Sequence, residues 1–149
     1  MESRMKLEES ISNFYYDMTV AELRLMGQQG SAISYNSVLY LDLISYLERH
    51  GGCTVSCLAK VLHVSVPAVT MKVQGLVREG LVEKRRDEMD RRKQYIVCNK
   101  AVQQVLADYD RPFGRAVRQI EDQFTEAEIQ QFIHFLSTLS AAYQKELNI

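Results

Sequence analysis

The sequence lacks long apolar runs and a secretory leader. No stretch approaches the roughly 20 apolar residues of a membrane span, and the N-terminal MESRMKLEES has no apolar segment like that of a signal peptide. We therefore expect a cytoplasmic protein without a membrane partner. Cysteine is scarce too. Three residues, an odd number without a secretory signal, argue against a disulfide framework.

Recognisable catalytic motifs are also missing. The chain contains no Gly-rich phosphate loop, no His-Glu-x-x-His and no nucleophile in a characteristic turn. Asp87 and Asp90 form a close acidic pair, but the surrounding arginines favour their ionised forms, which are unsuited to acid catalysis. The sequence predicts a protein that is not an enzyme and uses no cofactor.

Net charge is almost absent, at −1, but its distribution is uneven. Residues 51–100 carry ten basic and five acidic side chains, whereas residues 1–50 and 101–149 each carry four basic and seven acidic ones. Six of the basic residues fall within KRRDEMDRRK, residues 84–93. Since fields are screened within about 10 Å, this segment predicts a local anion-binding face. A solvated hairpin with internal ion pairs is the alternative.

With 149 residues, 46% of them hydrophobic, the chain is long enough for one globular domain, or for a small domain with dimerisation arms. Apolar residues recur at helical spacing over residues 5–27, until GQQGSAIS breaks the pattern. A helix over residues 36–50 is followed by Gly51-Gly52, and residues 54–80 hold two short helices.

The second half begins with two predicted strands, GLVEKRR and KQYIVCN, which flank the charged loop. Helix resumes after Lys100, where Pro112 and Gly114 predict a kink or break. Thr125 and Glu128 have the spacing of a capping box and begin a last helix. The predicted fold class is mainly α with a small β-hairpin (α+β).

The two end helices are amphipathic, yet the central unit between them is too small to cover both apolar stripes. We expect residues 1–30 and 101–149 to form a helical dimerisation region between two copies of the chain. Packing within one chain is the alternative. The predicted dimer contacts are Leu7, Ile11, Phe14, Ile129, Phe132, Ile133, Leu136, Leu139 and Tyr143.

Residues 55–74 have the pattern of a helix-turn-helix. Thr54 and Ser65 are candidate N-caps, and Val64 is expected to fill the turn. The inner faces are predicted to carry Leu58, Ala59, Leu62, Val69 and Val73. A second helix of this kind can enter the major groove of DNA. Its outward residues are predicted to be Ser65, Pro67, Ala68, Thr70, Met71 and Lys72.

The order of these parts, with GLVEKR after the helix pair and DRRKQYIV in the returning strand, resembles the multiple-antibiotic-resistance regulator (MarR) family. The resemblance covers nearly the whole chain and is tightest from Thr54 to Asn99. It implies a winged helix-turn-helix domain over residues 31–100. It further implies a homodimeric regulator, expected to be an effector-responsive repressor, on a near-palindromic double-stranded DNA operator. His63 departs from the usual glycine of the turn, and Met71 from the usual polar residue.

The resemblance also implies roles for the charged loop, which would be the wing. Arg91 or Arg92 would enter the minor groove, and Asp90 would orient them. Phosphate contacts or a salt-bridge network on the strands would be made by Lys84, Arg85, Arg86 and Lys93.

A small effector of unknown identity is a further expectation from the family. Aromatic residues that could line its pocket are Phe14, Tyr15, Tyr35, Tyr40 and Tyr46. At helical spacing, such residues are also ordinary core residues.

Two other functions remain open on the sequence. His50, Cys53 and Cys57 could bind zinc or form a thiol switch, although no fourth ligand is placed and a free cysteine commonly acts as a small hydrophobe. Cys98, on a predicted strand, is expected to be buried. The winged helix could also bind a protein partner and not DNA.

Overall fold

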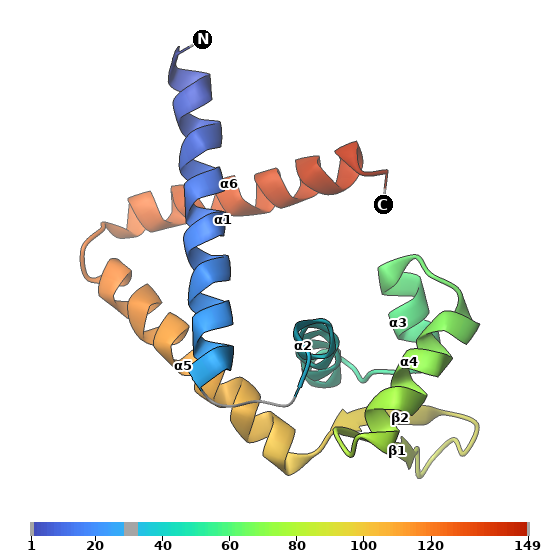
Figure 1. Cartoon of the computed structure of the whole chain (residues 1–149). Coiled ribbons are helices and arrows are strands. Elements are labelled where there is room, and N and C mark those ends of the chain that lie inside the picture. The colour runs from blue at the N-terminus through green and yellow to red at the C-terminus, as the bar shows by residue number, and fades with distance from the viewer. Residues whose placement is uncertain (1, 29–32, 149) are drawn as a thin grey trace. The chain divides into compact units, whose positions relative to one another are not determined.

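The computed structural model describes residues 2–28 and 33–148 (Figure 1). The elements are α1 (Glu2–Gln28), α2 (Tyr35–Arg49), α3 (Val55–Leu62), α4 (Val66–Arg78), β1 (Val82–Arg86), β2 (Gln94–Cys98), α5 (Lys100–Glu121) and α6 (Glu126–Glu146). The strands pair antiparallel, with Val82 opposite Cys98 and Arg86 opposite Gln94. This confirms the predicted class. Residues 29–32 of GQQGSAIS lie outside the described residues.

The chain forms two compact units, residues 1–40 and 41–149. In the first unit, the Ser34 hydroxyl accepts the Ser37 backbone N–H at 3.2 Å, and the Tyr35 hydroxyl donates to Glu22 Oε2 at 3.4 Å. The second unit contains α3 to α6, the hairpin and most of α2, so it holds all the residues predicted to read DNA.

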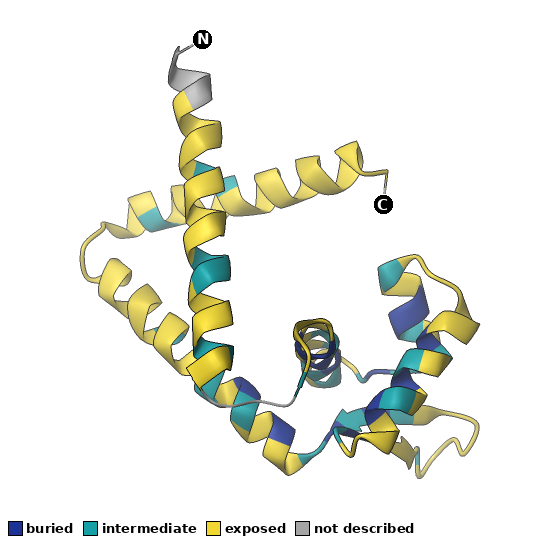
Figure 2. Cartoon of the chain, in the orientation of Figure 1, coloured by how far each residue is buried: buried dark blue, intermediate teal, exposed yellow. Residues whose placement is uncertain are grey.

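The core of the second unit is formed by buried apolar side chains from α2, α3, α4, the hairpin and α5 (Figure 2). Its largest buried side chains are Leu41, Ile44, Leu58, Val69, Val73, Leu76 and Ile96, each at most 1% exposed. The burial of Leu58, Ala59, Val69 and Val73 confirms the predicted inner faces of the helix pair, while Leu62 is half-buried.

One sequence-based expectation is wrong, and the structure excludes one half of a second, which was a kink or a break at Pro112 and Gly114. Val64 does not fill the turn but is 44% exposed, because the turn is closed by backbone hydrogen bonds and needs no apolar filling. The helix after Lys100 does not break, since α5 continues through Pro112 to Glu121. A proline removes one backbone N–H, and the ladder on either side of it can continue.

Helix α6 contributes no buried residue to this core. Phe132, Ile133 and Tyr143 are 58%, 52% and 64% exposed. On α1, the residues from 6 to 28 are likewise exposed or half-buried. Each end helix therefore carries apolar side chains that the single chain leaves uncovered.

Within the described residues, no single helix is long and apolar enough to cross a membrane. Only α3 and α4 together meet that criterion, as a pair bent by 120°.

Asn99 connects the start of α5 to the segment between α4 and β1 by three hydrogen bonds. Its Oδ1 accepts the Val102 N–H at 2.8 Å and caps α5, its Nδ2 donates to the Gly80 carbonyl, and its backbone N–H donates to Leu81 O at 3.1 Å.

Replacing Asn99 with Ala should lower the free energy of unfolding by about 1–2 kcal/mol, because the cap and one further bond are lost. Urea denaturation followed by circular dichroism measures this. Asn99→Ser, which keeps a capping oxygen, should lose less, and an Ala variant as stable as the parent would contradict the assignment.

Candidate nucleic-acid interface

The turn between α3 and α4 is built from capping interactions. Thr54 Oγ1 accepts the Cys57 N–H at 3.1 Å and begins α3, which confirms the predicted N-cap. His63 ends the helix with φ 53° and ψ 40°, and the Val64 N–H donates to Ala59 O at 3.1 Å. This is the left-handed helix end that usually carries glycine. The chain turns by 120° here, within the range of helix-turn-helix motifs.

Helix α4 presents one face to the core and the opposite face outward. Ser65 caps it by accepting the Ala68 N–H at 3.3 Å, as predicted, and Pro67 lies in the first turn. Val69, Val73 and Leu76 point inward and are fully buried. The predicted DNA-facing residues lie on the rest of the surface, where Ser65, Pro67, Ala68 and Met71 are exposed and Thr70 and Lys72 are half-buried. The outward face of α4 is therefore open to a ligand.

The hairpin separates the basic residues of β1 into two sets, because successive side chains of a strand point to opposite faces. Lys84 and Arg86 continue the face that carries buried Val82, whereas Arg85 lies on the other face. There the Arg85 guanidinium is 3.3 Å from Glu83 Oε2, in an exposed ion pair. Of the predicted contacts on β1, Arg86 therefore shares a face with Lys84, and Arg85 does not.

Two aspartates hold the wing loop by bonding to its backbone. Asp87 Oδ1 accepts the Met89 N–H at 2.8 Å, and Asp90 Oδ1 accepts the Arg92 N–H at 3.1 Å. The loop closes where the Asp87 N–H donates to Lys93 O at 3.1 Å. The bond from Met89 is the main reason that the pKa of the Asp87 carboxyl lies below its usual value. Both carboxylates thus support the backbone of the loop, and the expected role of Asp90 in orienting the arginine side chains stays a prediction.

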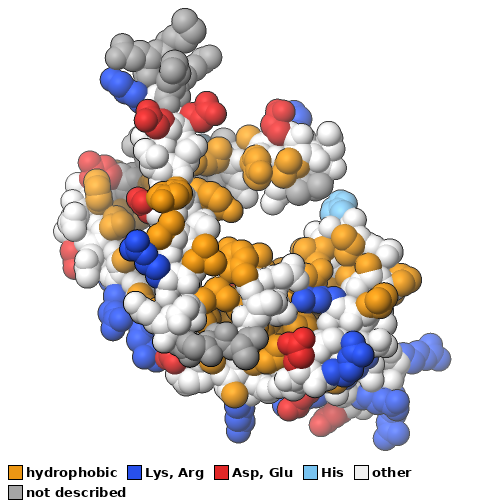
Figure 3. Space-filling model, in the orientation of Figure 1, with side chains coloured by type: hydrophobic (Ala, Val, Ile, Leu, Met, Phe, Trp, Pro, Cys, Tyr) orange, Lys and Arg blue, Asp and Glu red, His pale blue; other side chains and the backbone are white. Residues whose placement is uncertain are grey.

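The arginines at the wing tip make no ion pair with a described residue, although the loop also carries Asp87, Glu88 and Asp90. Arg91 and Arg92 are exposed, and neither is in an ion pair within the described part of the chain. Figure 3 shows Lys and Arg side chains gathered at the lower right, where Figure 1 places the hairpin loop. Lys84, Arg92 and Lys93 also line a hollow of about 520 Å³ between the hairpin and Thr54, Val55 and Ser56 at the start of α3. This arrangement suits a polyanion.

The cysteines and His50 do not form a metal site. Among the described residues, no group of three or more His, Cys, Asp and Glu side chains could hold an ion. His50 Nδ1 lies 2.7 Å from the Tyr46 carbonyl oxygen, and its ring stacks on Tyr46. Cys53 and Cys98 are 1% exposed, which confirms the expected burial of Cys98. Burial raises the pKa of both thiols to about 12, so they are protonated at neutral pH.

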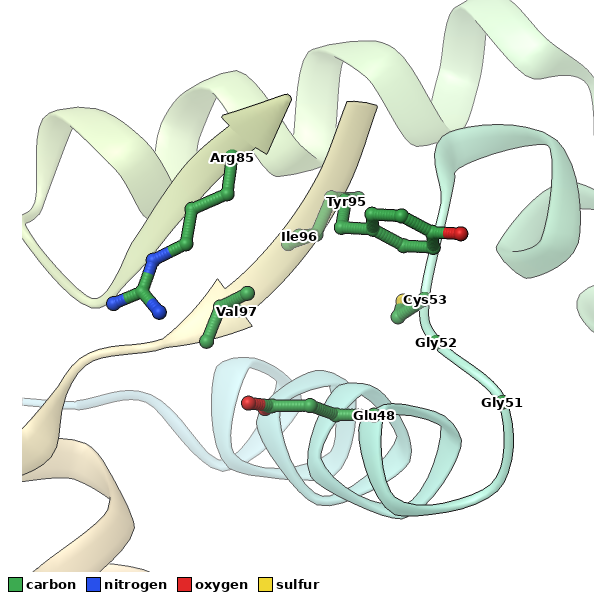
Figure 4. A pocket seen from close by; sticks show the side chains of 8 residues that line it. All are labelled: Glu48, Gly51, Gly52, Cys53, Arg85, Tyr95, Ile96 and Val97. Carbon is green, nitrogen blue, oxygen red and sulfur yellow. The ribbon is translucent and has the colours of Figure 1, made fainter. Parts of the chain in front are cut away.

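The aromatic residues expected to line an effector pocket are mostly on the surface. Phe14, Tyr15 and Tyr46 are 60%, 72% and 53% exposed, and Tyr40 is half-buried. None of the five lines the 520 Å³ hollow or the neighbouring hollow of about 370 Å³ in Figure 4. The effector pocket stays a prediction.

Residues 37–93, which run from α2 to the wing loop, match the model of the MarR family. The HTH-type transcriptional regulator YcgE of Bacillus subtilis (strain 168) is 28% identical to this chain over 101 residues. Over residues 37–93 the chain is similar to the MarR family. The predicted resemblance is thus confirmed, and so is the expectation of a non-enzyme, because MarR proteins are transcription regulators.

The match to YcgE spans 68% of this chain and 66% of YcgE, slightly less than two thirds of that relative. FabT of Streptococcus pneumoniae, in a crystal structure of its complex with DNA, has a TM-score of 0.72 at 24% identity, with 95% of this chain and 97% of FabT covered. A MarR family protein from Bacillus stearothermophilus has a TM-score of 0.66 at 18% identity, with 96% of each chain covered. Both establish the winged helix fold.

Sequence reasoning missed a contact next to the wing of this protein. The sequence predicts Gly51-Gly52 only as the end of a helix and Tyr95 only as a strand residue, but the Tyr95 ring lies against Gly52. One glycine is enough for a helix end. The second glycine was the available sign of a close approach, since only glycine leaves the space of a Cβ free.

Thiol reactivity provides a test of the redox alternative. In the native protein at pH 7–8, a maleimide should modify half-buried Cys57 faster than Cys53 and Cys98, whose burial disfavours the reactive thiolate. Mass spectrometry of peptides after timed labelling measures the three rates. Equal rates in urea would serve as the control, and fast native labelling of Cys53 would contradict the burial argument.

Proposed function

We propose that this protein is a homodimer that binds a near-palindromic double-stranded DNA operator and represses transcription until an effector releases it. One observation carries the proposal. The helix α4, whose outward face is open, and the hairpin, whose tip carries arginines in no ion pair with a described residue, pack on the same apolar core. A regulator of this kind acts where the DNA lies, so the expected cytoplasmic location is part of the proposal.

The major groove, about 12 Å wide, admits an α-helix. Helix α4 would enter it with its N-terminal half, where Ser65 and Thr70 carry hydroxyls. The Thr70 hydroxyl donates to Val66 O at 2.8 Å, so its lone pairs are turned outward to accept from a base or a water. Met71, 73% exposed, offers an apolar contact suited to a thymine methyl group.

The wing would add minor-groove and phosphate contacts. Arginine is favoured where the minor groove is narrow, because the negative potential is enhanced there. Of the two candidates, Arg92 also lines the cationic hollow with Lys84 and Lys93. We therefore assign Arg92 to the phosphates beside the groove and Arg91 to the groove itself.

The apolar residues of α6 support the dimer. A single chain leaves Phe132, Leu136 and Leu139 at 58%, 47% and 37% exposure, which is costly in water unless a second surface covers them. A second copy is the occupant we propose, because two-fold symmetry would repeat α4 at about 34–36 Å, one turn of DNA. An effector would then act by favouring a dimer geometry that no longer spans both half-sites.

A double substitution of Arg91 and Arg92 by Ala tests the wing. It should weaken operator binding about 10- to 100-fold and reduce the slope of log affinity against log salt by up to about two, because two cations leave the interface. Fluorescence anisotropy with a duplex selected from random fragments, at several salt concentrations, measures both. Arg115→Ala with Arg118→Ala on α5 removes the same charge elsewhere and is the control. Equal effects of the two pairs would refute the wing assignment.

Replacing Phe132 and Leu136 with Glu tests the dimer. Since α6 contributes no buried side chain to the single chain, the charged residues should separate the protomers and leave the winged core folded. Analytical ultracentrifugation measures the mass, and circular dichroism the helix content. Gln130→Glu, an exposed polar change on the same helix, is the control. A double variant that still sediments as a dimer would overturn the proposed interface.

A further inference from the structure

Tyr95 occupies the junction between the hairpin and the segment that joins α2 to α3. It lies on β2 opposite Arg85 and lines both hollows beside the hairpin. Figure 4 shows its ring extending from the strand toward Gly52 and Cys53. The ring is half-buried, whereas its neighbour Ile96 is 1% exposed. Tyr95 therefore lies at the edge of the core and is not one of its central side chains.

The ring of Tyr95 fills the position that a side chain at residue 52 would take. A Cβ on Gly52 would lie 2.5 Å from Tyr95 Cε1 and 2.9 Å from Cδ1, closer than real Cβ contacts. Gly52 also has φ +104°, a conformation that other residues rarely adopt. Gly51 has a similar φ of +111°, but a Cβ there would meet nothing within 4 Å. The two glycines thus share a positive φ, but only Gly52 lies against the Tyr95 ring.

The segment beneath the ring is tied on both sides. The Gly52 N–H donates to Leu47 O in the last turn of α2 at 2.9 Å, and the Ile96 N–H donates to Cys53 O at 2.8 Å. The ring of Tyr95 therefore packs against the Gly52–Cys53 segment, which is hydrogen-bonded to both α2 and β2.

The other end of Tyr95 reaches the wing loop. Tyr95 is also one of the groups that lower the pKa of the Asp87 carboxyl, after the backbone N–H groups of Met89 and Asp90. Asp87 in turn holds the Met89 N–H and so shapes the start of the loop. Gly52 and Tyr95 also line the 520 Å³ hollow together with Arg92 and Lys93 of the wing, so the ring lies between the α2–α3 segment and the wing.

We propose that Tyr95, seated on Gly52, is a positioning residue that sets the orientation of the wing relative to α2 and the helix pair. The proposal rests on the function proposed above, since it acts through the wing arginines and does not require that Tyr95 touch DNA. On this proposal, residues of the α2–α3 segment affect the affinity for the operator, although they are not the arginines that contact DNA.

The glycine pair provides the matched test. Gly52→Ala and Gly51→Ala add comparable backbone strain, but only Gly52→Ala displaces the ring. Gly52→Ala should weaken operator binding about 10-fold more than Gly51→Ala, the scale of one lost specific contact. In a Tyr95→Ala background the two alanine variants should agree within about twofold, because the ring is gone. Equal losses in the parent background would overturn the proposal.

Tyr95 variants separate positioning from general stability. Tyr95→Phe keeps the ring and should bind within about threefold of the parent, whereas Tyr95→Ala should bind about 10-fold more weakly. When Arg91 and Arg92 are already Ala, Tyr95→Ala should add less than about twofold, because the wing no longer contacts DNA. Full additivity would mean that Tyr95 acts only through stability and would refute the positioning role.

Hydrogen exchange of the free protein gives a readout that needs no DNA. The Met89 and Arg92 amides, held by Asp87 and Asp90, should exchange faster in Tyr95→Ala and Gly52→Ala but not in Gly51→Ala. Unchanged exchange in all three variants would refute the proposal. A parent protein that binds no duplex would instead refute the proposed function, and the exchange rates would still decide whether Tyr95 orients the wing.

Discussion

One apolar core has to hold both the helix pair and the hairpin, because residues 41–149 offer no second core of comparable burial among the described residues. Val69 and Val73 place α4 in it, and Ile96 and Val82 place the two strands. The outward face of α4 and the wing are therefore fixed by the same packing. A change that shifts one of them must shift the core, and closely packed interiors resist such shifts.

Around that core, the wing is organised so that its acids serve the backbone and its cations face outward. Asp87 and Asp90 bond to loop N–H groups, and neither neutralises the arginines at the tip. The chain as a whole can then be nearly neutral while Arg91 and Arg92 stay available to an anion within about one Debye length of the tip. Arg85 is the exception, since its ion pair with Glu83 on the outer face of β1 reduces its local charge.

Features that depend on a few neighbouring residues could be predicted from the sequence. The caps at Thr54, Ser65 and Asn99 follow from side-chain oxygens that bond to the next turn, and the burial of Val69 and Val73 follows from helical spacing. The left-handed His63 was also foreseeable, because a helix-turn-helix needs that conformation at the turn.

Some features could not be predicted although they are local. The exposure of Val64 follows from the backbone hydrogen bonds that close the turn, and the continuity of α5 through Pro112 depends on the ladder around it. Other features depend on parts of the chain that are distant in sequence. The placing of Arg85 and Arg86 on opposite faces needed the strand register, and the Tyr95 contact needed the path of the α2–α3 segment. Strand register and loop path are tertiary properties, so a pattern within one segment does not contain them.

The two adjacent glycines also bear on how this sequence can diverge. Position 51 is constrained only by its backbone angle, so asparagine or aspartate, which tolerate positive φ better than other residues, are the natural replacements. Position 52 is constrained by angle and by space, and its space is set by residue 95. Among descendants of this chain, position 52 should depart from glycine only where position 95 has lost its aromatic ring, and the two should therefore change as a pair.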